Sequence, residues 1–177
     1  MHVMFCWTLM IMSPELDQHI REKYPLIFQN ACEMSMGDGW FDIIDKLCAN
    51  IQVHIDNVAN QRKYTIDWNK DVNDPDYDWS DKSFFKREER KVPELVEQVV
   101  ASQIKEKFGT LRFYYYGGDD YIRGLEAMAD SMSAITCEEC GHPGQRHSTK
   151  KKSWIRVLCD KHAEEQGYIE DENSISE

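Results

Sequence analysis

Apolar and polar positions alternate with helical spacing most clearly between about Gly39 and Asn60. Apolar residues recur there at intervals of three and four, which is typical of a helix that buries one face. Asp38 stands just before this stretch and is predicted to cap the helix. The predicted buried face consists of Trp40, Ile43, Ile44, Leu47, Ile51, Ile55 and Val58.

Two shorter helices are predicted on either side of this one. The earlier helix should begin with Ser13 as its cap and Pro14 in its first turn, and Pro25 should end it. The later helix should follow a cap at Asp119 or Asp120. Its apolar side consists of Ile122, Leu125, Met128, Ala129 and Met132.

A β-hairpin is predicted between Gln98 and Tyr116, with its turn at Phe108 and Gly109, because β-branched and aromatic residues flank that turn. The side chains expected to face inward are Ile104, Leu111 and Phe113. The predicted fold class is therefore α+β, with helices packed on a hairpin or a small antiparallel sheet.

An acidic segment separates the long helix from the hairpin. Between Tyr64 and Ser83 the chain has six Asp, one Pro and no sustained period, which predicts a strand fragment followed by an acidic insertion near residues 67–83. Aromatic residues in this segment could anchor a protein partner with a basic surface, or they could fold back on the body. The candidate partner-binding residues are Trp68, Asp74, Asp76, Tyr77, Asp78 and Trp79.

Composition limits the class of protein. The chain has 177 residues, 41% of them hydrophobic, which is enough for a genuine core. Its net charge of −11 disfavours loose attachment to DNA, RNA or anionic lipid. The apolar start, residues 1–12, is too short to span a bilayer and has no cationic leader, so a buried strand is predicted there. We expect a cytoplasmic protein without membrane attachment.

Four potential metal ligands form two tight pairs near the C-terminus. Cys137 and Cys140 form a Cys-x2-Cys motif followed by a glycine, and Cys159 and His162 form a Cys-x2-His motif after eighteen further residues. A two-residue spacer lets both side chains of a pair converge on one ion. Three thiolates and one imidazole complete a tetrahedral zinc shell with no position for a reacting water. One structural zinc ion is therefore predicted.

Other assignments of these residues remain open. His142 or His147 could replace His162 as the fourth ligand, and the cluster could also stay without metal as buried cysteines. The remaining cysteines, Cys6, Cys32 and Cys48, have no partner spacing and are predicted to be small core residues. Three cysteines group with a histidine and three are scattered. This pattern favours a metal site in a reducing compartment over disulfide bonds.

The order of elements around the ligands is typical of treble-clef zinc modules. A knuckle should be followed by a short hairpin, whose second arm is SWIRVL, and then by a helix that carries the last two ligands. This predicts a body over residues 1–136, a zinc-binding module over 137–168 and a disordered acidic tail over 169–177.

The module is the basic part of the chain. Residues 137–162 carry six Lys and Arg against three Asp and Glu. Its hairpin could contact nucleic-acid phosphates, with a tryptophan available for stacking. The residues of this alternative are Arg146, Lys150, Lys151, Lys152, Trp154 and Arg156.

Three stretches together resemble a family of small uncharacterised proteins encoded by bacteria and their phages. The stretches are GDGWFDIIDKLC, QIKEKFGTLRFYYYGGDD, and CEECGHPG with WIRVLCDKHA. In that family a Gly-Trp helix, a Lys-Phe-Gly-x-Leu-Arg-Phe-Tyr hairpin and a Cys-Cys-Cys-His module occur in this order. The resemblance implies this order and a zinc site, and it implies no activity. The stretch from Asp67 to Asp81 is an addition to the pattern, so its role is not inherited.

No catalytic motif stands out in the sequence. Phosphate-loop, nucleophile-elbow and His-Glu-x-x-His patterns are all missing from it. Asp38, Asp42 and Asp45 could serve a carboxylate-dependent hydrolase or nuclease, but acidic residues are expected at a helix start. The predicted function is non-enzymatic macromolecule binding, as by a phage or mobile-element accessory factor that binds or inhibits a host protein.

Overall fold

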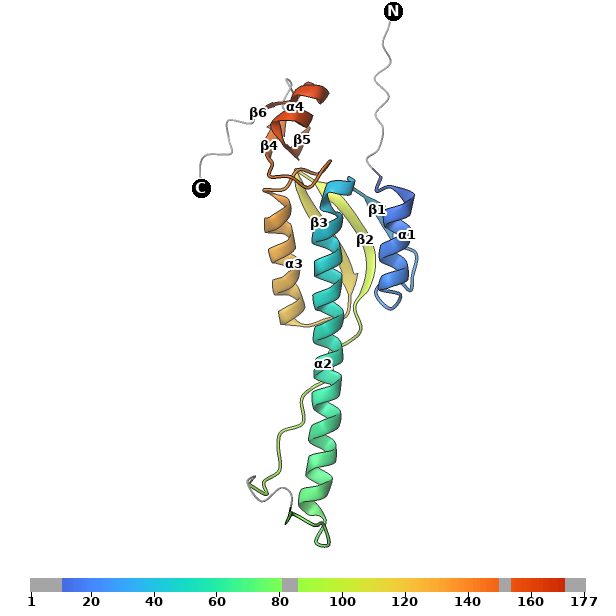
Figure 1. Ribbon diagram of the computed structural model, residues 1–177, viewed down its shortest axis with the longest axis vertical. Helices are drawn as coiled ribbons and strands as arrows, with labels where there is room; N and C mark the ends of the chain where they lie inside the picture. Colours follow the sequence, from blue (N-terminus) through green and yellow to red (C-terminus); the bar gives the residue numbers. More distant parts are fainter. Residues whose placement is uncertain (1–10, 81–85, 150–153, 171–177) are drawn as a thin grey trace, which may run out of the picture.

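The computed structural model describes residues 11–80, 86–149 and 154–170. Within these residues the chain forms four α-helices and two three-stranded sheets, so the α+β fold class is confirmed. Figure 1 shows a body of helices and sheet, a small module at one end of it, and a long helix that leaves the body at the other end. Most of the predicted N-terminal strand falls on residues 1–10, outside the described part of the chain.

The body sheet is built on the predicted hairpin. Strands β2 (Val100–Lys107) and β3 (Thr110–Tyr116) pair antiparallel around a turn at Phe108 and Gly109. A short strand that the sequence did not predict, β1 (Glu33–Ser35), pairs parallel with β2. The sheet is therefore mixed, with the order β1-β2-β3.

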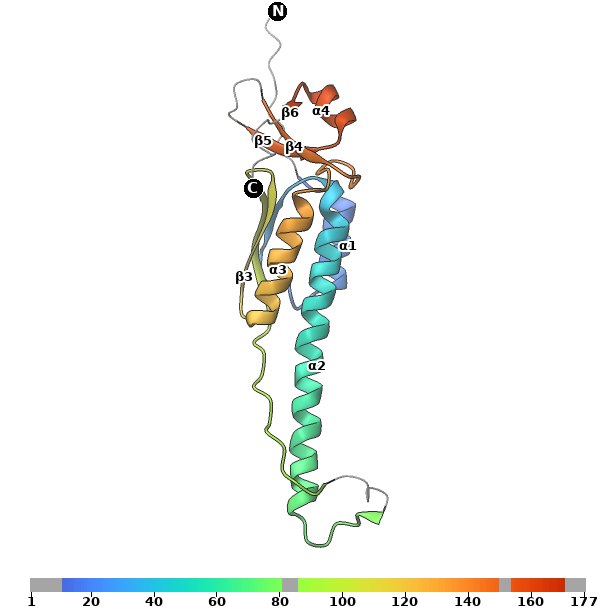
Figure 2. The ribbon, with the colours of Figure 1, turned by 90° about the vertical axis from the view of Figure 1, so that its left-hand side faces the viewer.

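Three helices lie on one side of this sheet, as Figure 2 shows. They are α1 (Pro14–Lys23), α2 (Phe41–Asn73) and α3 (Asp120–Ser133). The side chain of Asp119 accepts a hydrogen bond from the backbone N of Ile122, which confirms the predicted cap. Met128 and Met132, which belong to the predicted apolar side of α3, are 54% and 43% exposed because they lie at the edge of the α2–α3 contact. No helix in the described ranges is long and apolar enough to cross a membrane.

The C-terminal module has the predicted order of elements. Strands β4 (Gln145–Ser148) and β5 (Ile155–Leu158) form a hairpin, and α4 (Asp160–Gln166) follows it. Residues 169 and 170 were predicted to belong to a disordered tail, but they form β6 (Ile169–Glu170), which pairs with β4. The rest of that predicted tail, residues 171–177, lies outside the described residues.

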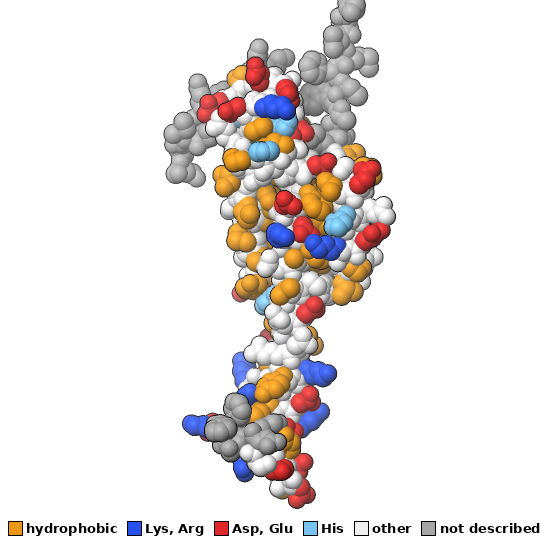
Figure 3. Space-filling view, viewed as in Figure 1, with side chains coloured by type: hydrophobic (Ala, Val, Ile, Leu, Met, Phe, Trp, Pro, Cys, Tyr) orange, Lys and Arg blue, Asp and Glu red, His pale blue; other side chains and the backbone are white. Residues whose placement is uncertain are grey.

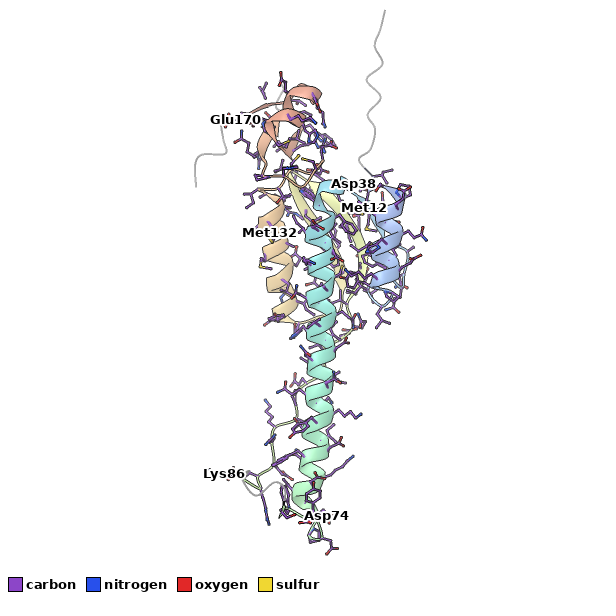
Figure 4. The ribbon with its side chains drawn as sticks, in the orientation of Figure 1. Met12, Asp38, Asp74, Lys86, Met132 and Glu170 are labelled. Atoms are coloured by element: carbon purple, nitrogen blue, oxygen red, sulfur yellow. The ribbon has the colours of Figure 1, made fainter. Side chains whose placement is uncertain are left out.

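Helix α2 is much longer than predicted. It follows a 3-10 turn (Asp38–Trp40) and runs for 33 residues, about 50 Å at the usual rise per residue. The predicted end at Asn60 and the predicted strand fragment at Tyr64 are both wrong. Asp38 does not cap this helix, because its carboxylate accepts a hydrogen bond from the backbone N of Ser13 at 2.7 Å. In Figure 4, Asp38 and Asp74 lie near the two ends of α2.

The second half of α2 and the chain that returns along it form an arm, which we define as residues 56–80 and 86–95. Beyond Ile55, no residue of α2 belongs to the body core. Side chains of the helix instead bind the backbone of the returning chain. Asn69 donates to the carbonyl of Arg90 (2.8 Å) and accepts from its N–H (2.9 Å), as a neighbouring strand would. Arg62 donates to the carbonyl of Pro93 (2.7 Å).

An aromatic cluster near the end of the arm accounts for the continuation of the helix. Trp68 is 3% exposed, and its ring meets the ring of Trp79 edge-on with 5.5 Å between centroids. The indole N–H of Trp68 donates to the carbonyl of Glu88 (3.0 Å), and the guanidinium of Arg90 lies 4.0 Å from the centre of its ring. The arm thus has a small core of its own, separate from that of the body.

We predict that Trp68→Ala loosens the arm and leaves the body intact. Losing a buried tryptophan costs about 3 kcal/mol, and this cost should fall on the local stability of the arm. Hydrogen exchange should therefore accelerate at the amides of residues 62–73 and 86–93 and stay slow in β2 and β3. Lys63→Ala, at an exposed position of the same helix, is the control. Equal loss of protection in body and arm would contradict a separate arm core.

Candidate metal centre

Two short backbone motifs bring the predicted ligands together. Cys137 and Cys140 lie on a tight turn after α3, closed by a hydrogen bond from the N–H of Gly141 to the carbonyl of Cys137 (2.9 Å). Gly141 adopts a φ of 74°, a left-handed conformation that favours glycine. Cys159 precedes α4 and His162 lies in its first turn. One pair therefore precedes the module hairpin in the chain and the other follows it, and the hairpin brings them together.

The four ligand atoms have the spacing of a tetrahedral metal shell. Nδ1 of His162 lies 3.4 Å from Sγ of Cys137 and 3.4 Å from Sγ of Cys159, and Sγ of Cys140 lies 3.9 Å from Sγ of Cys159. All four atoms lie within 4.8 Å of one another. With metal–sulfur bonds of about 2.3 Å, neighbouring ligand atoms would be about 3.8 Å apart. These four residues can therefore bind a metal ion.

The thiols of this cluster differ in their electrostatic surroundings. Burial raises the pKa of Cys137 to about 11, so the thiolate form that binds metal is costly without a cation. The backbone N–H of His162 lowers the pKa of Cys159 by stabilising its thiolate. A divalent cation would stabilise every thiolate in the cluster, which couples metal binding to ordering of the module.

The turn before α2 docks on the backbone of the knuckle. The N–H of Gly39 donates to the carbonyl of Glu138 (2.8 Å), and the indole N–H of Trp40 donates to the carbonyl of Thr136 (2.8 Å). The N–H of Gly37 donates to the buried carboxylate of Glu138 (3.2 Å). The GDGW stretch thus donates hydrogen bonds to three acceptors next to the metal ligands. This docking contact explains why the stretch contains two glycines and a tryptophan.

Gly39 is needed at this contact because the knuckle leaves no space for a side chain. A Cβ atom at Gly39 would lie 2.6 Å from the backbone N of Cys140, closer than real Cβ atoms approach other heavy atoms. The opposing atoms belong to the backbone of the knuckle, so no side-chain rotation can relieve the clash. The sequence carried a signal for this contact, a glycine at the start of an amphipathic helix, but gave no indication of the opposing surface.

A buried ion pair links the knuckle to β5. Arg156 donates from Nε to the carboxylate of Glu138 (2.9 Å) and from Nη1 to that of Glu139 (3.0 Å). Glu138 and Arg156 are 0% and 5% exposed. Burial raises the pKa of Glu138, and the nearby Arg156 acts in the opposite direction. Arg156 also donates to Gln166 (2.8 Å), so one guanidinium connects the knuckle, the hairpin and α4.

Arg156 is therefore wrong as a nucleic-acid contact, since it is buried and occupied by carboxylates. Of the other residues predicted for that role, Arg146 is half-buried and Trp154 is 45% exposed. Lys150, Lys151 and Lys152 lie outside the described residues.

The remaining cysteines and histidines do not join the metal cluster. His147 is buried in β4, where its Nδ1 lies 2.9 Å from the carbonyl of Gln145, and His142 is exposed. Cys32 and Cys48 are buried in the body core, as predicted, and Cys6 lies outside the described residues. His162 is therefore the histidine that the structure brings to the three cysteines.

The predicted partner-binding residues divide into two groups. Trp68 and Trp79 are buried in the arm, so they are wrong as exposed anchors; Tyr77 is half-buried, with its ring 4.9 Å from that of Trp79. Asp74, Asp76 and Asp78 are exposed, and Figure 3 shows acidic side chains gathered at the end of the arm. The rings thus hold the arm together, and the aspartates face solvent.

The carboxylates proposed for a hydrolase do not form a site. Asp45 is buried and accepts hydrogen bonds from Lys23 (2.6 Å) and from the hydroxyl of Tyr24 (2.9 Å). Asp38 binds the backbone before α1, and Asp42 is exposed. In the described part of the chain, these residues belong to no cluster of potential metal ligands. Their contacts anchor α1 to α2.

The chain matches no protein-family model, no curated protein and no solved structure. The residues and their geometry are therefore the basis for any statement of function.

We predict that Gly39→Ala destabilises the protein by about 1–3 kcal/mol, because the added methyl group must push the knuckle away from α2. The same change should weaken metal binding, since the knuckle carries two ligands. Gly124→Ala is the matched control, because nothing lies within 4 Å of its Cβ position on α3. It should stabilise the protein by about 0.5–1 kcal/mol. Thermal unfolding and metal titration measure both effects, and equal melting temperatures for the two variants would contradict the docking contact.

Proposed function

We propose that this chain is a non-enzymatic binding protein with one structural zinc ion and an arm that binds a protein partner with a basic surface. Zinc is the metal of choice because three thiolates and one imidazole are its preferred tetrahedral set. Four protein ligands leave no open position for water or substrate, so the ion acts by holding the knuckle against α4.

The observation that carries the proposal is the arm. It extends beyond the body core and is held together by its own tryptophan cluster and hydrogen bonds. The arm contributes no side chain to the body core, so the body core does not depend on the arm for its stability. An ordered projection of this kind offers a large accessible surface at low entropic cost, because its backbone is already fixed before a partner binds.

The charge at the end of the arm indicates the kind of partner. Residues 67–80 carry five Asp against one Lys. Asp74 and Asp78 accept hydrogen bonds from the backbone N–H groups of Asp76 and Ser80, both at 2.9 Å, so the loop holds these carboxylates in fixed positions. Fixed negative charge attracts a cationic surface and raises the rate of encounter with it. A phage or mobile-element accessory role, with a host protein as target, stays a prediction within this proposal.

We predict that the purified protein contains about one zinc ion per chain and loses it with Cys140→Ser. Loss of the ion should lower the melting temperature and accelerate hydrogen exchange in residues 137–148 and 154–166, because folding of the module depends on the metal. Elemental analysis and hydrogen exchange measure these effects. Cys32→Ala, which removes a buried cysteine outside the cluster, should keep the metal. A metal-free protein with an unchanged melting temperature would contradict a structural ion.

We predict that changing Asp74, Asp76 and Asp78 together to Asn abolishes capture of a basic partner from a bacterial lysate. Asn keeps an oxygen for the turn hydrogen bonds and removes only the charge. The control changes Glu15 and Glu22 to Gln and Asp42 to Asn, which alters net charge equally on exposed positions of the body. Quantitative mass spectrometry should find basic proteins retained by wild type and control alone. Equal recovery of basic proteins with both triple variants would show that the aspartates of the arm do not bind the partner.

A further inference from the structure

The outer face of the body sheet is a second surface with its own chemistry. In Figure 2 the helices lie on one side of the sheet, and no element of the described residues covers the other side. Ile104 and its partner Phe113 face the core. Because side chains alternate along a strand, the neighbours of these two residues on β2 and β3 point to the outer face. The outward side chains of the two strands are Val100, Gln103, Lys105, Lys107, Thr110, Arg112, Tyr114 and Tyr116.

Two aromatic rings follow each other on this face. Tyr114 and Tyr116 are 42% and 71% exposed, and they point to the same side of β3. Residues two apart on a strand are separated by about 6.8 Å, so the rings form adjacent flat platforms. Exposed rings on an open sheet can stack with bases without regard to sequence, because every base has a π-face.

A third exposed ring stands at the hairpin turn in a conformation that phenylalanine disfavours. Phe108 has a φ of 57° and is 66% exposed. The two positions of such a turn both require positive φ and are best filled by Asn, Asp or Gly. Phe108 buries little surface, so packing does not account for its presence. An exposed ring held in a strained turn indicates a role in binding.

The turn also joins the sheet face to the module hairpin. A Cβ atom on Gly109 would lie 3.2 Å from Cγ2 of Ile155, so the turn abuts β5. Phe108 and Trp154 are each adjacent in sequence to one member of this contact, so both residues lie near the junction. Trp154 is 45% exposed. Exposed aromatic residues therefore occur on β3, at the hairpin turn and at the start of β5.

Cations lie among these rings. Nζ of Lys105 is 5.4 Å from the ring centre of Tyr114, and Nζ of Lys107 is 5.4 Å from that of Phe108. Arg112 occupies an outward position on β3, but its guanidinium forms an ion pair with Asp130 of α3 at 2.7 Å and does not add to the positive charge of the face. The outward positions of β2 and β3 carry no carboxylate, and β1 adds Glu33. The net charge of −11 does not cancel this local cationic character, since charges beyond about 8 Å are largely screened at physiological salt.

We infer that this face binds single-stranded nucleic acid, with bases stacked on Tyr114, Tyr116 and Phe108 and phosphates held by Lys105 and Lys107. Lysine is depleted from the cores of protein interfaces but is a standard phosphate contact, so lysines placed between rings favour a nucleic acid over a protein. The face lies apart from the arm tip, and this inference holds independently of the arm's partner.

Fluorescence anisotropy with labelled oligo(U) and oligo(dT) of about 12 nucleotides tests the inference. Binding should weaken between about 50 and 200 mM salt with a slope of about −1.4 or steeper in log K against log salt, which corresponds to two or more phosphate contacts. The two oligonucleotides distinguish RNA from DNA as the preferred ligand. A duplex of the same length should bind more weakly, because its bases are not accessible for stacking.

Single substitutions separate stacking from charge. Tyr114→Ala and Tyr116→Ala should each weaken binding by about five-fold or more. Tyr64→Ala is their matched control, because Tyr64 is a 58% exposed tyrosine on the arm. Lys105→Gln with Lys107→Gln should flatten the salt dependence, and Lys63→Gln should not. Phe108→Asn should weaken binding while the melting temperature stays equal or rises, because Asn suits the turn.

Three outcomes would overturn the inference. One is the lack of salt-sensitive binding of either oligonucleotide at low salt. Another is equal affinity for duplex and single strand, because binding would then depend on electrostatic attraction to phosphates and not on base stacking. The last is an equal effect of the Tyr64 control and the Tyr114 variant. A lower melting temperature for Phe108→Asn would assign Phe108 to the fold and exclude it from the site.

Discussion

The contact between Gly39 and the knuckle that carries Cys137 and Cys140 is the constraint on which the arrangement of this protein depends. It joins the first turn before α2 to the backbone between two metal ligands. Because α2 is a rigid rod of 33 residues, fixing its start also fixes the direction of the arm. This contact crosses the predicted domain boundary between residues 136 and 137, so it joins the module that carries the metal site to the helix that bears the arm.

Features that depend on short-range patterns were predictable from the sequence. The ligand pairs were recognisable because a two-residue spacer between cysteines, followed by a glycine, is typical of a metal-binding knuckle. The hairpin and the first half of α2 were predictable because residues near in sequence decide strand alternation and helix periodicity. The same local rules placed the cap at Asp119 or Asp120, and the side chain of Asp119 binds an N–H group only three residues further on.

The features that were not predictable depend on partners far along the chain. The second half of α2 is mostly polar and has no long apolar stripe. It is helical because Trp68 and Asn69 bind backbone about twenty residues later. β1 has three residues, too few for a pattern, and needs β2 beside it. Arg156 has the sequence context of a surface cation, but its partner is the buried Glu138, eighteen residues earlier. Local sequence offers no signal for such pairs.

The net charge of −11 is not evenly distributed over the protein, because the acidic arm tip and the lysines of the sheet face lie far apart. The acidic arm tip lies beyond about 27 Å of helix that follows the last core residue of α2, Ile55. That length exceeds the Debye length of about 8 Å several times, so the aspartates at the tip neither repel phosphates at the sheet face nor neutralise its lysines. One chain can therefore present an anionic and a cationic surface at once. A basic protein on the arm and a single strand on the sheet could be held by the same molecule, because each would meet a surface of opposite charge and the rigid arm would keep the two apart.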